Sequence, residues 1–282
     1  MTEMRDWAGR TGDSWASEWR RTDLSFSNLA TKLDAAILAV APKSGTAIDI
    51  GCGAGATAIA LAEARPSLTV IGRDISPQLV EAARARGAGH ANLRFEAGDA
   101  TDLTERGVDL FCSRHGVMFF DDPVAAFGAF RRAAAPDAAF VFSCFRSPAL
   151  NPWAAETVAA AGGSPPPPPP AGSEPPPGPF AFADPTRVER ILTASGWRGE
   201  PQAVDYRYRA GEGPDAVEEA LALFSRIGPS AMHLASLDDD ARAAGRDRLR
   251  AFLASREVNG AVDFPAAAWV WTCHAVEQGG TA

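Results

Sequence analysis

Between residues 46 and 145, short apolar runs alternate with longer segments whose apolar residues recur at helical spacing. Short apolar runs of this kind are typical of strands buried on both faces, and their alternation with helices indicates βαβ units and a parallel sheet. Three helix starts are explicit, because an N-cap residue precedes proline at 76–77, 122–123 and 184–185. The pattern predicts strands at 46–50, 68–73, 93–96, 108–113 and 138–145, with helices at 55–65, 77–87 and 122–134.

The regions on either side of this alternation have a different character. Residues 1–40 hold three tryptophans and a helical stretch at 24–40, while 146–183 contains six consecutive prolines at 165–170. A polyproline run cannot join a sheet or continue a helix, so it predicts a stiff surface insertion. A helix at 184–195, strands at 204–209 and 266–276 and a helical block at 214–256 follow. We therefore expect an N-terminal cap segment (1–30), a core (31–145), a proline-rich cap insertion (146–183) and a completion of the core (184–282) that includes the 214–256 cap.

Composition narrows the class of protein. Of the 282 residues, 46% are hydrophobic and 22% charged, which is typical of a globular protein, and the net charge of −8 argues against nucleic acid as a partner. No signal segment begins the chain and no apolar run has the roughly 20 residues of a membrane helix, so we expect no membrane partner. The four cysteines lie far apart, which predicts free thiols in the cytoplasm and no disulfide or metal site.

The most informative stretch is 47–55, AIDIGCGAG. An apolar run that carries Asp49 ends in Gly51, Gly53 and Gly55, and an alanine-rich helical segment follows. A strand, a glycine loop and a helix in this order present bare backbone N–H groups and the positive end of a helix to a ligand. The loop therefore predicts a binding site for a nucleotide-like small molecule.

Two kinds of nucleotide cofactor fit the loop. Gly51, Gly53 and Ala56 satisfy the dinucleotide fingerprint, and Asp74 follows at about the distance of its ribose-binding acid. Other features favour a different ligand: Asp49 lies inside the strand before the loop, a third glycine tightens the spacing, and Asp99 ends the third strand, where it can accept a hydrogen bond from an amine.

Four segments in order resemble the motifs of class I S-adenosylmethionine-dependent methyltransferases. They are 48–55 (IDIGCGAG), 72–77 (GRDISP), 96–100 (EAGDA) and 109–123 (DLFCSRHGVMFFDDP). The resemblance covers about 46–145, and the terminal regions are similar to a subgroup of bacterial-type small-molecule methyltransferases. It implies a Rossmann-like α/β three-layer sandwich around a seven-stranded, mostly parallel sheet with an antiparallel last strand.

The resemblance also implies roles for individual residues. Asp49 would hold the ammonium group of S-adenosylmethionine, Asp74 the ribose hydroxyls and Asp99 the adenine amine. The glycines would let the backbone approach the cofactor, and Cys52 would contribute size and backbone only. The remaining residues expected at the cofactor are Ile75 and Ala100 on the adenine and Ser113 and Arg114 at the methionine moiety.

Two positions depart from the family pattern. Asp137 and Ala138 replace the usual Gly-Gly after Pro136, and His115 stands where an apolar aromatic residue is more usual, which makes it a candidate general base. For Trp15 and Trp19, packing of a helix and a lid over the cofactor both stay open.

The function that the resemblance implies is transfer of the sulfonium methyl group to an O, N or C nucleophile of a small, fairly apolar acceptor, with release of S-adenosylhomocysteine. Aromatic residues available to line the acceptor site are Phe119, Phe120, Trp153, Phe180, Phe182 and Phe224. An NAD-dependent oxidoreductase and a non-catalytic regulator that binds S-adenosylmethionine are the alternatives. The motifs name neither the acceptor nor the oligomeric state.

Overall fold

The computed structural model of the chain describes residues 7, 9–165 and 174–276. Its centre is one mixed sheet in the order β3-β2-β1-β4-β5-β8-β6, with the short strand β7 paired to β8. Strands β1 to β5 run parallel, whereas β8 lies antiparallel between β5 and β6. The strands are β1 (Ser44–Ile50), β2 (Ser67–Asp74), β3 (Leu93–Ala97), β4 (Val108–Arg114), β5 (Ala134–Phe145), β6 (Trp197–Glu212), β7 (Glu257–Val258) and β8 (Ala261–Ala275).

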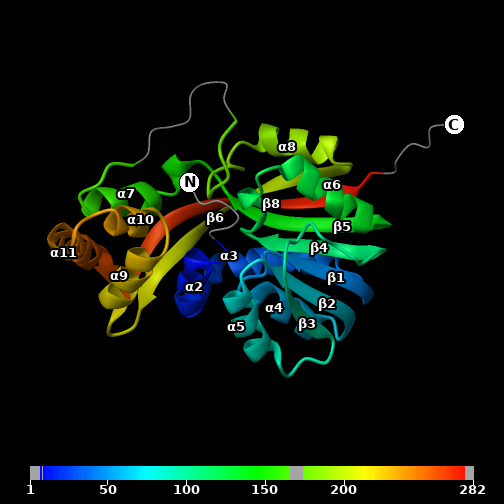
Figure 1. Cartoon of the computed structure of the whole chain (residues 1–282), viewed down its shortest axis with the longest axis horizontal. Coiled ribbons are helices and arrows are strands. Elements are labelled where there is room, and N and C mark those ends of the chain that lie inside the picture. Colours follow the sequence, from blue (N-terminus) through cyan, green and yellow to red (C-terminus); the bar gives the residue numbers. More distant parts are fainter. Residues whose placement is uncertain (1–6, 8, 166–173, 277–282) are drawn as a thin grey trace.

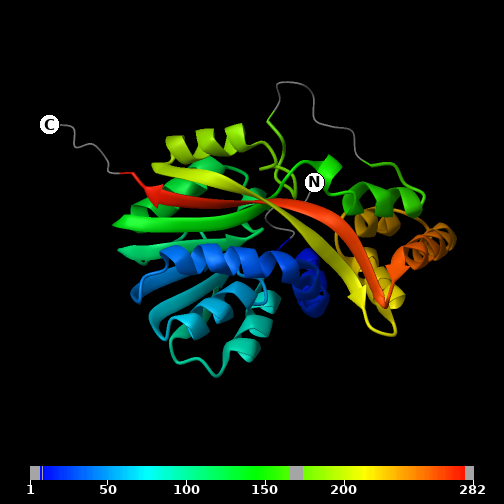
Figure 2. The same ribbon diagram turned by 180° about the vertical axis from the view of Figure 1, so that it is seen from behind.

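Helices cover both faces of this sheet (Figure 1 and Figure 2). Helices α3 and α4 pack together on one face, with α5 beside them, and α6 packs against α8 on the other. The α-helices are α2 (Arg10–Ser17), α3 (Trp19–Val40), α4 (Ala56–Ala64), α5 (Pro77–Gly87), α6 (Pro123–Ala133), α7 (Trp153–Ala160), α8 (Pro185–Ala194), α9 (Ala216–Arg226), α10 (Pro229–Ala235) and α11 (Asp239–Arg256).

The expected α/β sandwich, with a mostly parallel sheet and an antiparallel last strand, is confirmed. The difference is one extra strand: the two residues of β7 form a hairpin with β8, so the sheet has eight strands instead of seven. The turn of this hairpin contains Asn259, whose φ of 54° is left-handed, and Gly260 follows it. An Asn-Gly pair is a strong sequence signal for such a turn, and residues 259–260 are such a pair.

The predicted helix starts are present. The side chains of Ser76, Asp122 and Asp184 each accept a hydrogen bond from a backbone N–H in the first turn of the helix that follows, and proline occupies an early helical position each time. These caps satisfy N–H groups that the helix itself leaves without partners. The ends of the helices near the site are therefore set by local sequence.

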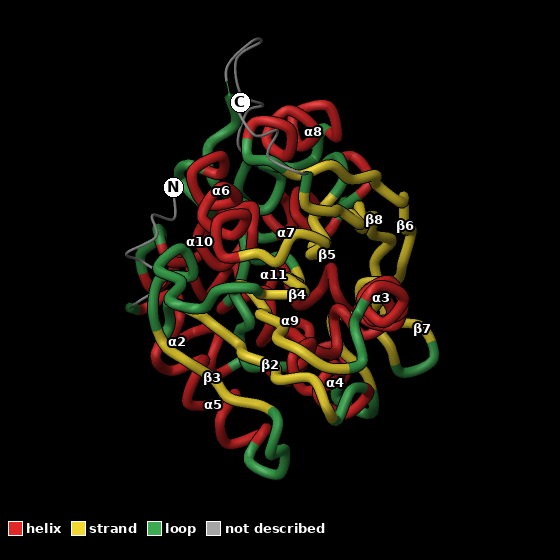
Figure 3. Tube along the Cα trace, turned by 90° about the vertical axis from the view of Figure 1, so that its right-hand side faces the viewer, coloured by secondary structure: helices red, strands yellow, loops and turns green. Residues whose placement is uncertain are grey.

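Strands β6 and β8 are much longer than their neighbours in the sheet. They pair from Trp197 and Ala275 at one end to Glu212 and Ala261 at the other, and their far part leaves the sheet as a two-stranded ribbon. Helices α9 and α11 pack on this ribbon, with α7 and α10 packed against them. We call α9, α10 and α11 the helical cap. Figure 3 shows the strands as one continuous layer between helices on both sides.

The hydrophobic core lies between the sheet and these helices. Its largest buried side chains are aromatic, and Phe111, Phe130, Phe140 and Trp197 form a cluster in which ring centroids are 5.6–6.0 Å apart. Aromatic pairs at this separation add stabilisation beyond the area that they bury. The four cysteines are free and buried, as the sequence predicts.

Within the described residues, no helix is both long and apolar enough to cross a membrane.

Candidate active site

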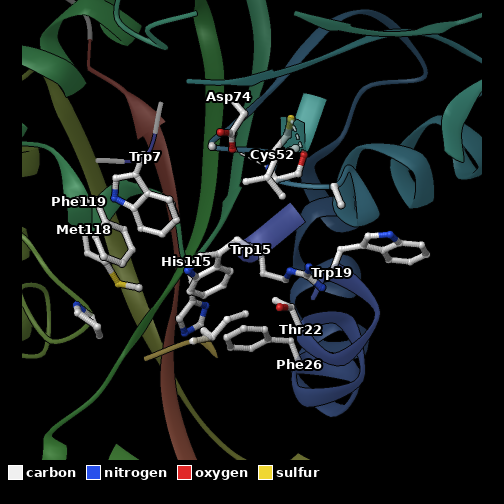
Figure 4. Close-up of a pocket in the computed structure, with 18 of the residues that line it drawn as sticks. Trp7, Trp15, Trp19, Thr22, Phe26, Cys52, Asp74, His115, Met118 and Phe119 are labelled. Carbon is white, nitrogen blue, oxygen red and sulfur yellow. Dashed lines mark hydrogen bonds between the residues drawn. The ribbon is translucent and has the colours of Figure 1, made fainter. Parts of the chain in front are cut away.

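A cavity of about 200 Å³ opens where the carboxyl ends of β1, β2 and β4 meet. It contains the site residues that the sequence predicts from four separate segments, and α2, α3 and the cap contribute the rest of its wall. Figure 4 shows Trp7, Trp15, His115 and Phe119 gathered on one side of this space, with Asp74 and Cys52 of the β2 end and glycine loop opposite them. The predicted residues that line it are Asp49, Gly51, Cys52, Gly53, Asp74, Ile75, Asp99, Ala100, Arg114 and His115.

The glycine loop has the backbone conformation that its sequence predicts. Gly51, Gly53 and Gly55 all have positive φ, and a Cβ atom on Gly53 would meet no other atom within 4 Å. This glycine therefore faces open space in the cavity. Helix α4 begins directly after Gly55, which has no side chain to cap it, so the first N–H groups of the helix remain available to a ligand.

Asp74 connects the second strand to the glycine loop. Its Oδ2 atom accepts a hydrogen bond of 2.8 Å from the backbone N–H of Gly53, and its Oδ1 atom accepts one of 2.9 Å from Ser76. Burial raises the pKa of this carboxyl group, while the two backbone donors oppose the rise. A carboxylate can accept about four hydrogen bonds, so it retains capacity for a ligand's hydroxyl groups.

Asp49 is buried without an ion-pair partner among the residues that the structure describes. It is 1% exposed, and no charged side chain there forms a hydrogen bond with its carboxylate oxygens. Burial raises its pKa to about 7, although the positive charge of Arg114 and the backbone N–H of Ala58 act in the opposite direction. A buried carboxylate without a countercharge is costly.

Asp99 forms a turn as well as lining the cavity. Its Oδ1 atom accepts hydrogen bonds from the backbone N–H and the hydroxyl group of Thr101, at 2.8 and 2.7 Å. Both bonds use the same oxygen, so the turn orients the carboxylate and leaves Oδ2 in position for a ligand. The two interpretations of Asp99, as a turn residue and as a ligand contact, are compatible.

Ser113 and Gly55 are predicted site residues that do not line the cavity. Ser113 is fully buried; its hydroxyl group donates to the backbone oxygen of Ile50 at 2.7 Å and accepts from the N–H of Gly116 at 3.2 Å. It thus holds the end of β4 against the end of β1. Gly55 lies behind the loop, where a Cβ would come within 2.6 Å of Phe95.

His115 has an unusual backbone conformation and a buried side chain. It has a left-handed φ of 59° and is 8% exposed; its Nδ1 atom lies 2.8 Å from the hydroxyl oxygen of Ser143, and its Nε2 atom has no partner. Burial, with a smaller contribution from Arg114, lowers its pKa to about 3. The imidazole is neutral at pH 7, and its low basicity makes it a poor match for general-base catalysis there. Left-handed backbone in a residue other than glycine is concentrated at functional sites.

The N-terminal helices form one wall of the cavity. Trp7, Trp15 and Trp19 line it, and the ring of Trp7 lies 5.5 Å from Trp15 and 5.0 Å from Phe119. Asp23 on α3 pairs with Arg114 at 2.6 Å and with Arg86 at 2.8 Å, which fixes this helix to β4 and α5. The tryptophans therefore both pack a helix and cover the site.

The remainder of the wall is aromatic, and sequence reasoning found only part of it. Phe119, Phe120, Trp153 and Phe224 line the cavity as expected, whereas Phe182 packs into the core against Phe127 and Phe142. Phe180 packs behind the cavity against Phe145 and Trp153. Lining residues that the sequence analysis did not select as site residues include Phe26, Met118, Phe145 and Tyr208. They come from α3, β5, β6 and the loop after β4, and no local motif links them.

Comparison with known proteins agrees with this geometry. Residues 42–161 match the family described as methyltransferase domain. Among curated proteins, demethylmenaquinone methyltransferase of Deinococcus radiodurans is 27% identical over 182 residues, which is 61% of this chain and 76% of the relative. Trans-aconitate 2-methyltransferase of Methylobacterium radiotolerans is 36% identical over 100 residues, covering 34% of this chain and 37% of that protein.

Two solved structures show the same fold. The YcgJ protein of Bacillus subtilis has a TM-score of 0.54 at 19% identity and covers 87% of this chain and 98% of its own. A Bacillus halodurans protein has a TM-score of 0.55 at 12% identity, with 87% and 99% covered. The family match therefore places a methyltransferase domain at residues 42–161, and the two solved structures share the α/β fold of the chain.

Proposed function

We propose that the cavity binds S-adenosylmethionine and that the chain transfers its methyl group to a small-molecule acceptor, with S-adenosylhomocysteine as the product. The observation that carries the proposal is the unpaired, buried carboxylate of Asp49 beside an open glycine loop. A positively charged ammonium group is the partner that this carboxylate lacks. The chemistry that the bound cofactor supplies is an electrophilic methyl group on a sulfonium sulfur, transferred by in-line displacement.

The residues of the chain would then hold the cofactor along the loop. Asp49 would bind the ammonium group, Asp74 the ribose hydroxyls and Asp99 the adenine amine through its Oδ2 atom. Ile75 would pack on the adenine, with the N–H of Ala100 directed to a ring nitrogen. Arg114 would lie at the methionine moiety, and Ser113 would hold β1 and β4 in register beneath it.

The protein's contribution to the rate would be alignment and exclusion of water. Aligning two reactants can contribute roughly 7–11 kcal/mol to the lowering of a barrier. Trp7, Trp15 and the cap cover the cavity and would exclude water from the reacting atoms. We infer a small acceptor because the cavity is small and enclosed by aromatic residues, and because both curated relatives are named for small-molecule substrates.

Calorimetry with the full chain tests the binding proposal. We expect S-adenosylhomocysteine to bind and NADH not to bind, because Asp99 and the tight glycine spacing suit the former. Tighter binding of NADH would contradict the cofactor assignment. A screen with methyl-labelled cofactor then tests transfer: labelled product from a small acceptor supports the enzyme, and binding without any product would favour a regulator.

A further inference from the structure

The cavity has a second part beyond the glycine loop, and its lining is almost entirely aromatic. We call Phe26, His115, Phe145, Trp153, Tyr208 and Phe224 the acceptor chamber. Ring centroids in this set lie close together: 4.9 Å from His115 to Phe26, 4.2 Å from His115 to Phe145, and 5.1 Å from Trp153 to Tyr208. Such walls favour a flat, apolar ring.

Within the described ranges, the cavity has no charged side chain that is free to bind a charged acceptor. Among the described residues that line the whole cavity, the charged ones are Asp23, Asp49, Asp74, Asp99 and Arg114. Three of these aspartates are assigned to the cofactor, and Asp23 and Arg114 pair with each other at 2.6 Å. A carboxylate or ammonium acceptor would therefore lose its hydration without gaining an opposite charge, which is strongly unfavourable.

Two polar atoms of the chamber are buried and unpartnered. They are Nε2 of His115 and Nε1 of Trp153, in side chains of residues that are 8% and 5% exposed. The indole N–H can only donate. Nδ1 of His115 lies 2.8 Å from the hydroxyl oxygen of Ser143, which is fully buried and has no other hydrogen-bond partner among the described residues. We infer that this hydroxyl group donates to Nδ1, because it has no other acceptor. The proton of a neutral imidazole then lies on Nε2, so His115 is a donor as well.

We propose that the acceptor is an uncharged ring compound whose phenolic or conjugated carbonyl oxygen accepts a hydrogen bond from Nε2–H of His115, with Ser143 fixing the tautomer. The inference rests on the proposed function, since the ring must lie beside the methyl donor. It assigns His115 to acceptor positioning and removes it as a general base. A phenolic acceptor would lose its proton to water before the oxygen–methyl bond forms and the sulfur–methyl bond breaks. Tyr208 cannot replace it as a base, because burial raises the pKa of its hydroxyl group to about 12.

The tautomer can be measured directly. Long-range ¹H–¹⁵N correlation spectra of the histidine-labelled protein should show protonated Nε2 and unprotonated Nδ1 for His115. Ser143→Ala removes the hydroxyl donor and should shift this signature toward a mixture of tautomers, with the fold unchanged in the backbone amide spectrum. A wild-type resonance with the proton on Nδ1 would overturn the proposal.

The class of acceptor is tested with three probes of one shape: 1-naphthol, 1-naphthoate and 1-naphthylmethylammonium, titrated into protein saturated with S-adenosylhomocysteine. We expect 1-naphthol to bind at least tenfold more tightly than either charged probe. His115→Phe keeps a ring and the same backbone strain, and it should weaken 1-naphthol binding severalfold without changing affinity for S-adenosylhomocysteine. His233→Phe is the matched control, because His233 also has an unpartnered Nε2 atom but lies outside the cavity.

The two proposals fail in different ways. Equal affinity for the three probes, or no binding of 1-naphthol, in a protein that still binds S-adenosylhomocysteine would overturn the acceptor class alone. Failure of the wild-type chain to bind S-adenosylhomocysteine would overturn the proposed function itself.

Discussion

The Oδ2 atom of Asp74 accepts a hydrogen bond of 2.8 Å from the backbone N–H of Gly53, so the end of β2 holds the glycine loop in its binding conformation. Asp74→Ala should therefore lose a ligand contact and loosen the loop. We expect affinity for S-adenosylhomocysteine to fall by about 1–3 kcal/mol, the usual range for a lost hydrogen bond to a charged group. Asp137→Ala, at an exposed position outside the cavity, is the control. Unchanged calorimetric affinity in Asp74→Ala would falsify the ribose assignment.

Asp49→Asn should change the stability of the fold and the affinity for the cofactor in opposite directions. The pKa of Asp49 is raised to about 7 in the folded chain, so between about pH 4 and pH 7 the folded state holds a proton that the unfolded state has released. Stability of the ligand-free wild type therefore falls as pH rises through this window, and above it the penalty is fully present. Asn carries no charge, so the variant should be more stable than wild type by up to about 4 kcal/mol at pH 8 and similar near pH 4.

The same variant should bind the cofactor more weakly at pH 8, because the ammonium group loses its carboxylate. Thermal unfolding and calorimetry at pH 4.5, 6 and 8 measure both effects. A variant that is less stable than wild type at pH 8, or that binds equally well there, would contradict the role given to Asp49.

Gly53→Ala and Gly55→Ala should fail for different reasons. Both glycines have positive φ, so each substitution costs backbone strain of about 1 kcal/mol. The new methyl group on residue 53 would enter open cavity, whereas that on residue 55 would overlap Phe95. We expect Gly53→Ala to lower cofactor affinity at nearly normal stability and Gly55→Ala to lower the melting temperature strongly. Similar melting temperatures for the two variants would be inconsistent with this packing.

Glu18 connects the N-terminal wall to the helical cap. Its side chain is fully buried and pairs with Arg21 and, at 2.5 Å, with Arg226 of α9; Arg21 also pairs with Glu219 of α9 at 2.6 Å. Glu18→Gln removes the shared charge, and we expect a loss of about 1–2 kcal/mol because the two arginines are partly exposed and can be hydrated. Amide exchange should increase in α2 and α9. Arg190→Gln, which removes an exposed surface pair between α8 and Glu174, should change neither helix.

The proline-rich segment should matter for the acceptor and not for the cofactor. Residues 166–173 of it lie outside the described residues, but the N–H of Gly178 donates to the backbone oxygen of Met118 at 3.1 Å and Pro179 lines the cavity. Replacing 164–179 with a glycine-serine linker of equal length should leave affinity for S-adenosylhomocysteine nearly unchanged and alter acceptor turnover. If cofactor binding is abolished instead, this segment is part of the cofactor site.

Most of the sheet could be predicted because the local patterns are strong. Strands β1 to β3 are short runs that end in or are directly followed by glycine or aspartate, and the predicted bounds of β1 to β4 differ from the observed ones by at most two residues. Strand β6 was predicted only at 204–209, whereas it spans Trp197–Glu212. Its first half contains glycine, glutamate and proline, which have low strand propensity, and long-range pairing with β8 overrides that preference.

The candidate cofactor residues could be selected for the same reason, since most of them lie at strand ends within recognisable motifs and line one cavity. Their roles stay predictions. The aromatic set of the acceptor chamber could not be selected as a whole from sequence. Phe26 lies on a helix face and Tyr208 in a polar-looking strand, and each meets His115 or Trp153 only through tertiary packing. The general-base hypothesis for His115 also depended on its surroundings, because only the folded structure shows the burial that lowers its pKa.

The ribbon formed by β6 and β8 carries one further consequence. The helical cap packs on β6 and β8, the same two strands that form one edge of the sheet. In the part of the chain that the structure describes, no separate linker lies between the cap and the sheet. A substrate would then enter when this hydrogen-bonded pair of strands bends, and such a pair is stiffer than a single-chain hinge. Selectivity for the acceptor could therefore change during evolution through substitutions in the ribbon of β6 and β8, while the residues of the proposed cofactor site stay the same.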